Sequence, residues 1–117
     1  MEDRVKRAWV VLMLGLSSMS ISEAGEIHGF VRAAGRNVGP EARIELRFPK
    51  RRAPYSTTTD ARGSYRIYVT ESGPGVLTLY YAQKNGSMSI YSTPQSIECN
   101  LDVGNPALSN TLHLQRK

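Results

Sequence analysis

Hydrophobic and polar residues alternate in short segments of this chain, with a repeat of two residues. Residues 42–48 and 64–69 show the pattern most clearly, and each places its apolar residues on one face and its polar residues on the other. A repeat of two is typical of a β-strand that buries one face. The apolar positions of the two segments are Ile44, Leu46 and Phe48, and Tyr65, Ile67 and Val69.

The remaining segments are also short and are separated by turn residues rather than by helical repeats. Asn85-Gly86 stands between two segments rich in strand-forming residues, which predicts a β-hairpin with its turn there. Pro94 is expected to end the second strand of that hairpin because proline cannot donate to a strand ladder. Six to eight short strands of this kind predict an all-β sandwich of two sheets. The predicted strands are residues 26–32, 42–48, 55–59, 64–69, 76–82, 87–93, 96–101 and 110–114.

Residues 57–69 are expected to organise the fold as a strand, a tight turn and a second strand. Asp60 and Gly63 occupy the first and last positions of a four-residue turn, the placement that a type I turn favours. The Asp side chain can accept hydrogen bonds from backbone nearby, and Gly tolerates positive φ. Asp60, Gly63 and the following Tyr65 are therefore predicted to be structural residues.

The first 24 residues have the pattern of a secretory signal peptide. Basic residues precede the apolar run 8–16, and Ser22-Glu23-Ala24 places small residues where signal peptidase cleaves. The apolar run is much shorter than the roughly 20 residues that a spanning helix needs. We therefore predict a signal peptide at 1–24, cleavage after Ala24, one domain at 25–117, and no stable membrane anchor after cleavage.

The positive charge of the chain indicates which class of partner the protein binds. The chain carries a net charge of +5, and residues 1–24 contain equal numbers of acidic and basic side chains, so the mature domain keeps that charge. On a secreted or periplasmic protein, a basic surface favours anionic envelope polymers or lipids over nucleic acid.

Cys99 is the only cysteine, and we expect it to be buried as a small apolar residue. A disulfide between chains is the alternative.

Several motifs together resemble the carboxypeptidase regulatory-like domain, a transthyretin-like fold. They are Ile27-x-Gly29-x-Val31 in the first predicted strand and Thr59-Asp60-x-x-Gly63-x-Tyr65-x-Ile67 around the turn, followed by Gly-Pro-Gly, a hairpin and a final Leu-x-Leu. The resemblance covers nearly all of residues 25–117. It implies a seven-stranded Greek-key β-sandwich that serves as an accessory or binding module, often grouped with carbohydrate-binding-like folds.

The residues give no support for catalysis. The transthyretin-like hydroxyisourate hydrolases end in Tyr-Arg-Gly-Ser, and this chain ends in Leu-Gln-Arg-Lys. The lysines of the mature part lie in predicted loops or at the terminus, so an internal isopeptide bond from a strand lysine is not expected. His28, His113 and Cys99 show no spacing that would form a nucleophile–base pair or a metal site. We therefore predict that the protein is not an enzyme and uses no metal or cofactor.

Two groups of side chains are candidates for binding. Five cations on and after the strand 42–48 can converge on one sheet edge, where they bind an anionic partner or protect an edge strand from pairing with other chains. Tyrosines on the solvent faces of strands can stack on sugars or on a partner protein, although ordinary cross-strand packing also explains them. These candidates are Arg43, Arg47, Lys50, Arg51 and Arg52, and Tyr68, Tyr91 and one of Tyr80 and Tyr81.

The sequence thus predicts a non-catalytic, secreted or periplasmic binding module for an envelope polysaccharide or another anionic polymer. The alternative is a protein–protein accessory subunit of an envelope or secreted assembly.

Overall fold

A computed structural model describes residues 25–117, and the predicted signal peptide lies outside the described residues. This part of the chain is all-β, with one short 3₁₀ turn at Pro106–Leu108 (η3). Ten strand segments are present, of which seven contain three or more residues. They are β2 Gly25–Ala33, β3 Arg36–Asn37, β4 Arg43–Arg47, β5 Tyr55–Thr58, β6 Ser64–Val69, β7 Gly73–Tyr81, β8 Lys84–Ser92, β9 Ser96–Glu98, β10 Leu101–Asp102 and β11 Gln115–Arg116.

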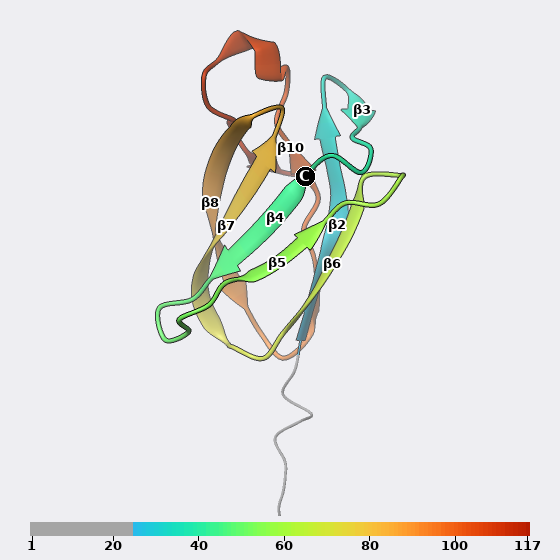
Figure 1. The fold of residues 1–117 in the computed structure, drawn as a ribbon. Coiled ribbons are helices and arrows are strands. Elements are labelled where there is room, and N and C mark those ends of the chain that lie inside the picture. The colour runs from blue at the N-terminus through green and yellow to red at the C-terminus, as the bar shows by residue number, and fades with distance from the viewer. Residues whose placement is uncertain (1–24) are drawn as a thin grey trace, which may run out of the picture.

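The strands form two sheets that share one core (Figure 1). In the first sheet β2 is central: β6 pairs with it in the antiparallel sense, and β9 and β10 pair in parallel with successive parts of its length. β3 and β11 complete this sheet by pairing with β2 and β10. The second sheet has the order β5-β4-β7-β8 and is entirely antiparallel. Within residues 25–117, no helix is long and apolar enough to cross a membrane.

The alternation seen in the sequence correctly identifies the buried faces. The apolar residues predicted on the inner faces of β4 and β6 are buried, and so are the inward-facing residues of β2 and β7. Burying alternate residues from two facing sheets is the principal source of stability in such a domain. The buried set from the four strands includes Ile27, Val31, Ile44, Leu46, Tyr65, Ile67, Val69, Leu77 and Leu79.

The turn between β5 and β6 has the predicted geometry, but the two strands do not pair with each other. The Gly63 N–H donates to the Asp60 carbonyl oxygen at 3.0 Å, and Gly63 has a φ of 77°. The Asp60 carboxylate accepts from the N–H groups of Arg62 and Ser64 at 2.9 and 3.0 Å. However, β5 pairs with β4 in one sheet and β6 pairs with β2 in the other. The turn therefore carries the chain from one sheet to the other.

The β7–β8 hairpin is present, but the predicted position of its turn is wrong. Tyr81 pairs with Lys84, so the two-residue loop is Ala82-Gln83, whose φ angles are 55° and 62°. Asn85-Gly86 lies within β8. This register pairs all nine residues of each strand, whereas a turn at Asn85-Gly86 would bring Pro94 into the ladder and leave the start of β7 unpaired. As predicted, β8 ends before Pro94.

The C-terminal region also differs from the prediction. The segment 110–114 is not a strand, and the last strand is β11. Leu112 instead lies against β8, where its N–H donates to the Asn85 carbonyl oxygen at 2.9 Å. The predicted strand 96–101 is divided into β9 and β10 at Asn100. The Cys99 N–H still donates to the His28 carbonyl oxygen of β2 at 2.7 Å, but the next N–H of β2, that of Phe30, donates to the Asn100 side-chain oxygen at 2.9 Å instead of to the backbone.

Candidate functional site

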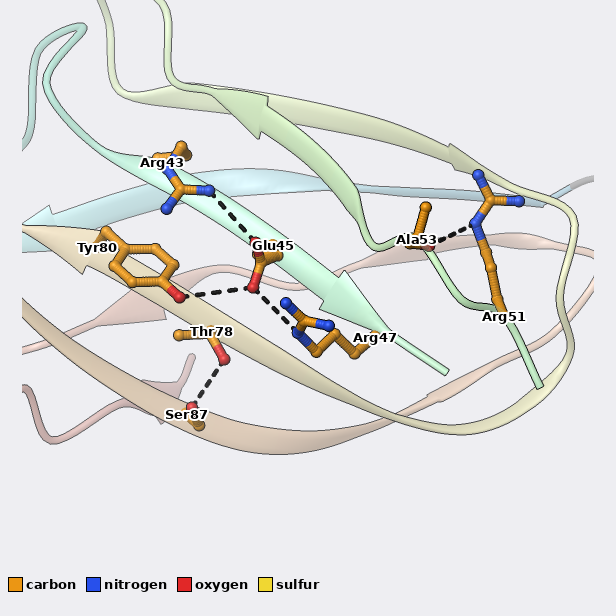
Figure 2. A network of polar contacts seen from close by, with 8 residues as sticks. All are labelled: Arg43, Glu45, Arg47, Arg51, Ala53, Thr78, Tyr80 and Ser87. Atoms are coloured by element: carbon orange, nitrogen blue, oxygen red, sulfur yellow. Dashed lines mark hydrogen bonds and ion pairs between the residues drawn. The ribbon is translucent and has the colours of Figure 1, made fainter. Parts of the chain in front are cut away.

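The outer face of the four-stranded sheet carries a network centred on Glu45 (Figure 2). Arg43 and Arg47 lie two residues to either side of Glu45 on β4, so all three side chains point to the same face. Their guanidinium groups lie 3.4 and 3.3 Å from the Glu45 carboxylate. The Tyr80 hydroxyl donates to the same carboxylate at 3.5 Å, and the Arg43 guanidinium stacks 4.1 Å above the Tyr80 ring. The carboxylate cancels one of the two positive charges.

The structure corrects the prediction that the basic residues follow a sheet edge. β4 lies between β5 and β7, so protection of an edge strand cannot explain Arg43 and Arg47. The five cations also do not form one patch. Arg43 is paired with Tyr80 near the hairpin end of β7, whereas residues 50–52 lie beyond the opposite end of β4.

The loop after β4 holds its cations differently. The Arg51 side chain donates from Nε to the Ala53 carbonyl oxygen at 2.8 Å and stacks 4.1 Å above the Tyr55 ring. Tyr55 itself faces the inner side of the sheet, opposite Leu46, so Arg51 lies away from the Glu45 network, as Figure 2 shows. Within residues 25–117, no carboxylate forms an ion pair with Lys50, Arg51 or Arg52. All three residues are exposed.

The predicted tyrosines do not form one cluster. Tyr68 belongs to β6 in the first sheet, whereas Tyr80 and Tyr91 belong to the second. Tyr80 pairs with Asn85 and Tyr91 with Pro74, which places them at opposite ends of the β7–β8 ladder. Tyr68 and Tyr91 are each 66% exposed, whereas Tyr80 is partly covered by its contacts in the Glu45 network.

Sequence reasoning missed a groove beside the basic loop. It consists of two hollows of about 420 and 260 Å³ that share Phe48, Pro49 and Pro74. The sequence signal was Gly73-Pro74-Gly75, which reads as a strand breaker but forms the start of β7. β4 ends opposite Val76, so among residues 25–117 this part of β7 has a neighbouring strand only on its β8 side.

The residues considered for catalysis or metal binding are dispersed. Cys99 is buried, as predicted. His113 lies outside any strand, and its Nε2 is 3.3 Å from the Ser109 hydroxyl. His28 lies in β2, near the start of the described residues. Among the residues that the structure describes, no three His, Cys, Asp or Glu side chains come together as a possible metal site.

Comparison with known proteins does not place the chain in a family. No protein-family model matches it, and no curated protein shows significant sequence similarity.

Proposed function

We propose that the protein is an exported, non-catalytic binding module that binds an anionic polymer of the cell envelope through the loop 50–52. The fold proposed for it is the seven-stranded Greek-key sandwich of the carboxypeptidase regulatory-like domain. Two crossings between the sheets support that topology: the chain passes from β5 to β6 in the other sheet and then returns to β7 beside β4.

One observation carries the binding proposal, namely the difference between paired and unpaired cations. Arg43 and Arg47 share the carboxylate of Glu45, whereas the loop 50–52 presents three positive charges with no acidic partner among residues 25–117. Exposed, uncompensated charge attracts a polyanion at long range, and this attraction is screened over about 10 Å at 0.1 M salt. Arg51 is also held in place by Tyr55, which lowers the entropy lost on binding.

The test is retention of the purified protein on immobilised anionic polysaccharide as the salt concentration rises. The double variant Lys50→Glu/Arg52→Glu leaves Arg51 on its tyrosine, and it should elute at much lower salt than the wild type. The matched control is Arg36→Glu/Arg62→Glu, which reverses two exposed charges in β3 and in the β5–β6 turn. β5 reaches this turn beside the start of β4, whereas the loop 50–52 follows the other end of β4, and β3 lies at the same end as the turn (Figure 1). If both variants lose the same amount of retention, the interaction depends on net charge alone and not on the loop 50–52, which would contradict the proposal.

The part of the β8 edge that lies beyond Leu112, from Ser87 to Tyr91, supports a protein–protein accessory role as the second candidate. The Asn85 carbonyl points away from β7, because it accepts from Leu112. The direction of the backbone N–H and C=O groups alternates along a strand, so those of Ser87, Ser89 and Tyr91 also point away from β7. Within residues 25–117, no strand lies on that side of β8. Ser89→Pro removes one outward N–H without breaking the β7 ladder, and it should abolish copurification of an envelope partner that binds there.

A further inference from the structure

The groove beside the basic loop arises where two strands of unequal length end. The last β4–β7 pair is Arg47 with Val76, and β7 extends beyond it to Gly73. Phe48 then turns inward and packs against Gly75, so closely that a ring carbon lies 2.7 Å from the position that a Cβ on Gly75 would occupy. The space between the start of the loop and the start of β7 is therefore left open. The lining residues include Arg47, Pro49, Lys50, Glu71, Pro74 and Val76.

The groove and the surface next to it are mainly apolar and accessible. Val76 is 44% exposed, and Tyr91, directly opposite Pro74 on β8, is 66% exposed. Pro49 and Pro74 have no N–H groups, so the groove offers few donors for a peptide backbone that would add as a strand. Apolar walls beside a free tyrosine ring instead suit the C–H faces of sugar rings.

The charges at the groove favour a ligand with carboxylates. Lys50 lines one hollow and has no acidic partner among residues 25–117, whereas Arg47 lines the other and uses its Nε to pair with Glu45. The terminal N–H groups of the Arg47 guanidinium can still donate to a second carboxylate. Glu71 is the acidic residue in the lining, and it already accepts hydrogen bonds from the hydroxyl groups of Tyr55 and Thr70. A sugar polymer that carries a carboxylate on its rings would match both the cations and the apolar walls.

We propose that this groove binds a polysaccharide of uronic acid residues, with sugar rings packed on Val76 and Tyr91 and with carboxylates at Arg47 and Lys50. This inference rests on the proposed function, because it assigns a ligand class to the surface that adjoins the basic loop.

The test measures binding of three soluble probes to the purified protein by calorimetry. The probes are an oligogalacturonate, its fully methyl-esterified form, and a polyglutamate peptide with the same number of carboxylates. The groove variant is Val76→Ser/Tyr91→Ser. Its matched control is Tyr68→Ser, which removes an equally exposed tyrosine from the other sheet. Circular dichroism and thermal unfolding check that each variant is folded.

We expect the oligogalacturonate to bind best, and its affinity to fall at least tenfold in the groove variant but not in Tyr68→Ser. The protein could instead bind oligogalacturonate and polyglutamate with equal affinity, with no loss in the groove variant but with loss in Lys50→Glu/Arg52→Glu. That result would overturn the proposal that the groove binds the ligand, and it would leave the proposed function of the loop 50–52 standing. If polyglutamate binds and loses affinity in the groove variant, the ligand of the groove is an acidic peptide, and the proposal of a polysaccharide is overturned. Equal binding of the methyl ester would exclude a role for carboxylates. Failure of all polyanions to bind would overturn both proposals.

Discussion

The hydroxyl of Tyr65 donates a hydrogen bond to the carbonyl oxygen of Cys99, 2.5 Å away. The two residues stand on opposite sides of β2, since Tyr65 pairs with Gly29 and Cys99 follows β9. A Cβ on Gly29 would lie 2.3 Å from the same carbonyl oxygen. Glycine at this position therefore leaves the space in which a buried tyrosine satisfies a buried backbone acceptor and connects three neighbouring strands.

Tyr65→Phe keeps the ring and removes the donor, so we expect the free energy of unfolding to fall by about 1–2 kcal/mol. Tyr65→Ala also leaves a cavity, and it should cost about 3 kcal/mol or more. Urea denaturation at neutral pH measures both losses. Unchanged midpoints in both variants would show that the residue is not part of the core.

The same contact predicts a dependence on alkaline pH. Burial, and then the proximity of Cys99, raises the pKa of Tyr65 well above its usual range. The unfolded chain releases this proton near pH 10, whereas the folded chain retains it, so stability should fall as the pH rises above about 10. In Tyr65→Phe this part of the pH dependence should be absent. Parallel alkaline profiles for the two proteins would contradict the assignment.

Gly63 is required for two reasons at the crossing between the sheets. Its φ of 77° is unfavourable for other residues, and a Cβ there would lie 2.3 Å from the Val38 carbonyl oxygen. Gly63→Val should therefore lower the free energy of unfolding by more than about 1 kcal/mol. Gly39→Val is the control, because a Cβ at Gly39 meets no atom within 4 Å. Similar losses in the two variants would mean that the turn has no special geometry.

Asp60 should make the protein sensitive to acid. The N–H groups of Ser64 and then Arg62 hold the pKa of its carboxyl below the usual value of 3.8. A lowered pKa contributes stability above the unfolded value, and this contribution is lost as the pH falls below about 4. Asp60→Asn keeps an acceptor oxygen without a charge. The stability difference between wild type and variant, measured by denaturation from pH 7 to pH 2, should shrink in acid; a constant difference would contradict this role.

Local alternation was enough to predict the buried faces of two strands, but it could not identify strand partners. The buried faces of β4 and β6 follow from a repeat of two, because side chains alternate between the faces of any strand. The same pattern contains no information about which strand lies alongside. For that reason the assignment of β5 and β6 to different sheets was not predicted from residues 57–69.

The candidate site shows the same limit. The positions of Arg43, Glu45 and Arg47 on one face were predictable from their spacing, whereas the Glu45 ion pairs depend on side-chain geometry. The groove depends on β4 ending before β7, which no local signal at Gly73-Pro74-Gly75 reveals. Proline is accepted there because a non-hydrogen-bonded position opposite Tyr91 needs no N–H.

Export can be tested by mass and fluorescence. Gly25 already pairs with Val69 at the start of β2, so cleavage after Ala24 would leave the described fold complete. Trp9 is the only tryptophan and lies in the predicted signal peptide. The exported protein should therefore begin at Gly25 by intact mass and show tyrosine emission alone. Tryptophan emission from protein recovered outside the cytoplasm would contradict cleavage.

The turn of the β7–β8 hairpin offers a stabilising substitution. Ala82 and Gln83 both have positive φ, which costs a residue with a Cβ roughly 1–2 kcal/mol. Asn-Gly is the preferred pair for a two-residue turn of this kind, so Ala82→Asn/Gln83→Gly should raise the free energy of unfolding by about 1 kcal/mol. Asn85→Ala should have little effect, because Asn85 lies in β8 and uses its backbone carbonyl to bind Leu112. Urea denaturation of both variants decides the register: if Asn85→Ala is strongly destabilising and the double variant is not stabilising, the turn lies at Asn85-Gly86.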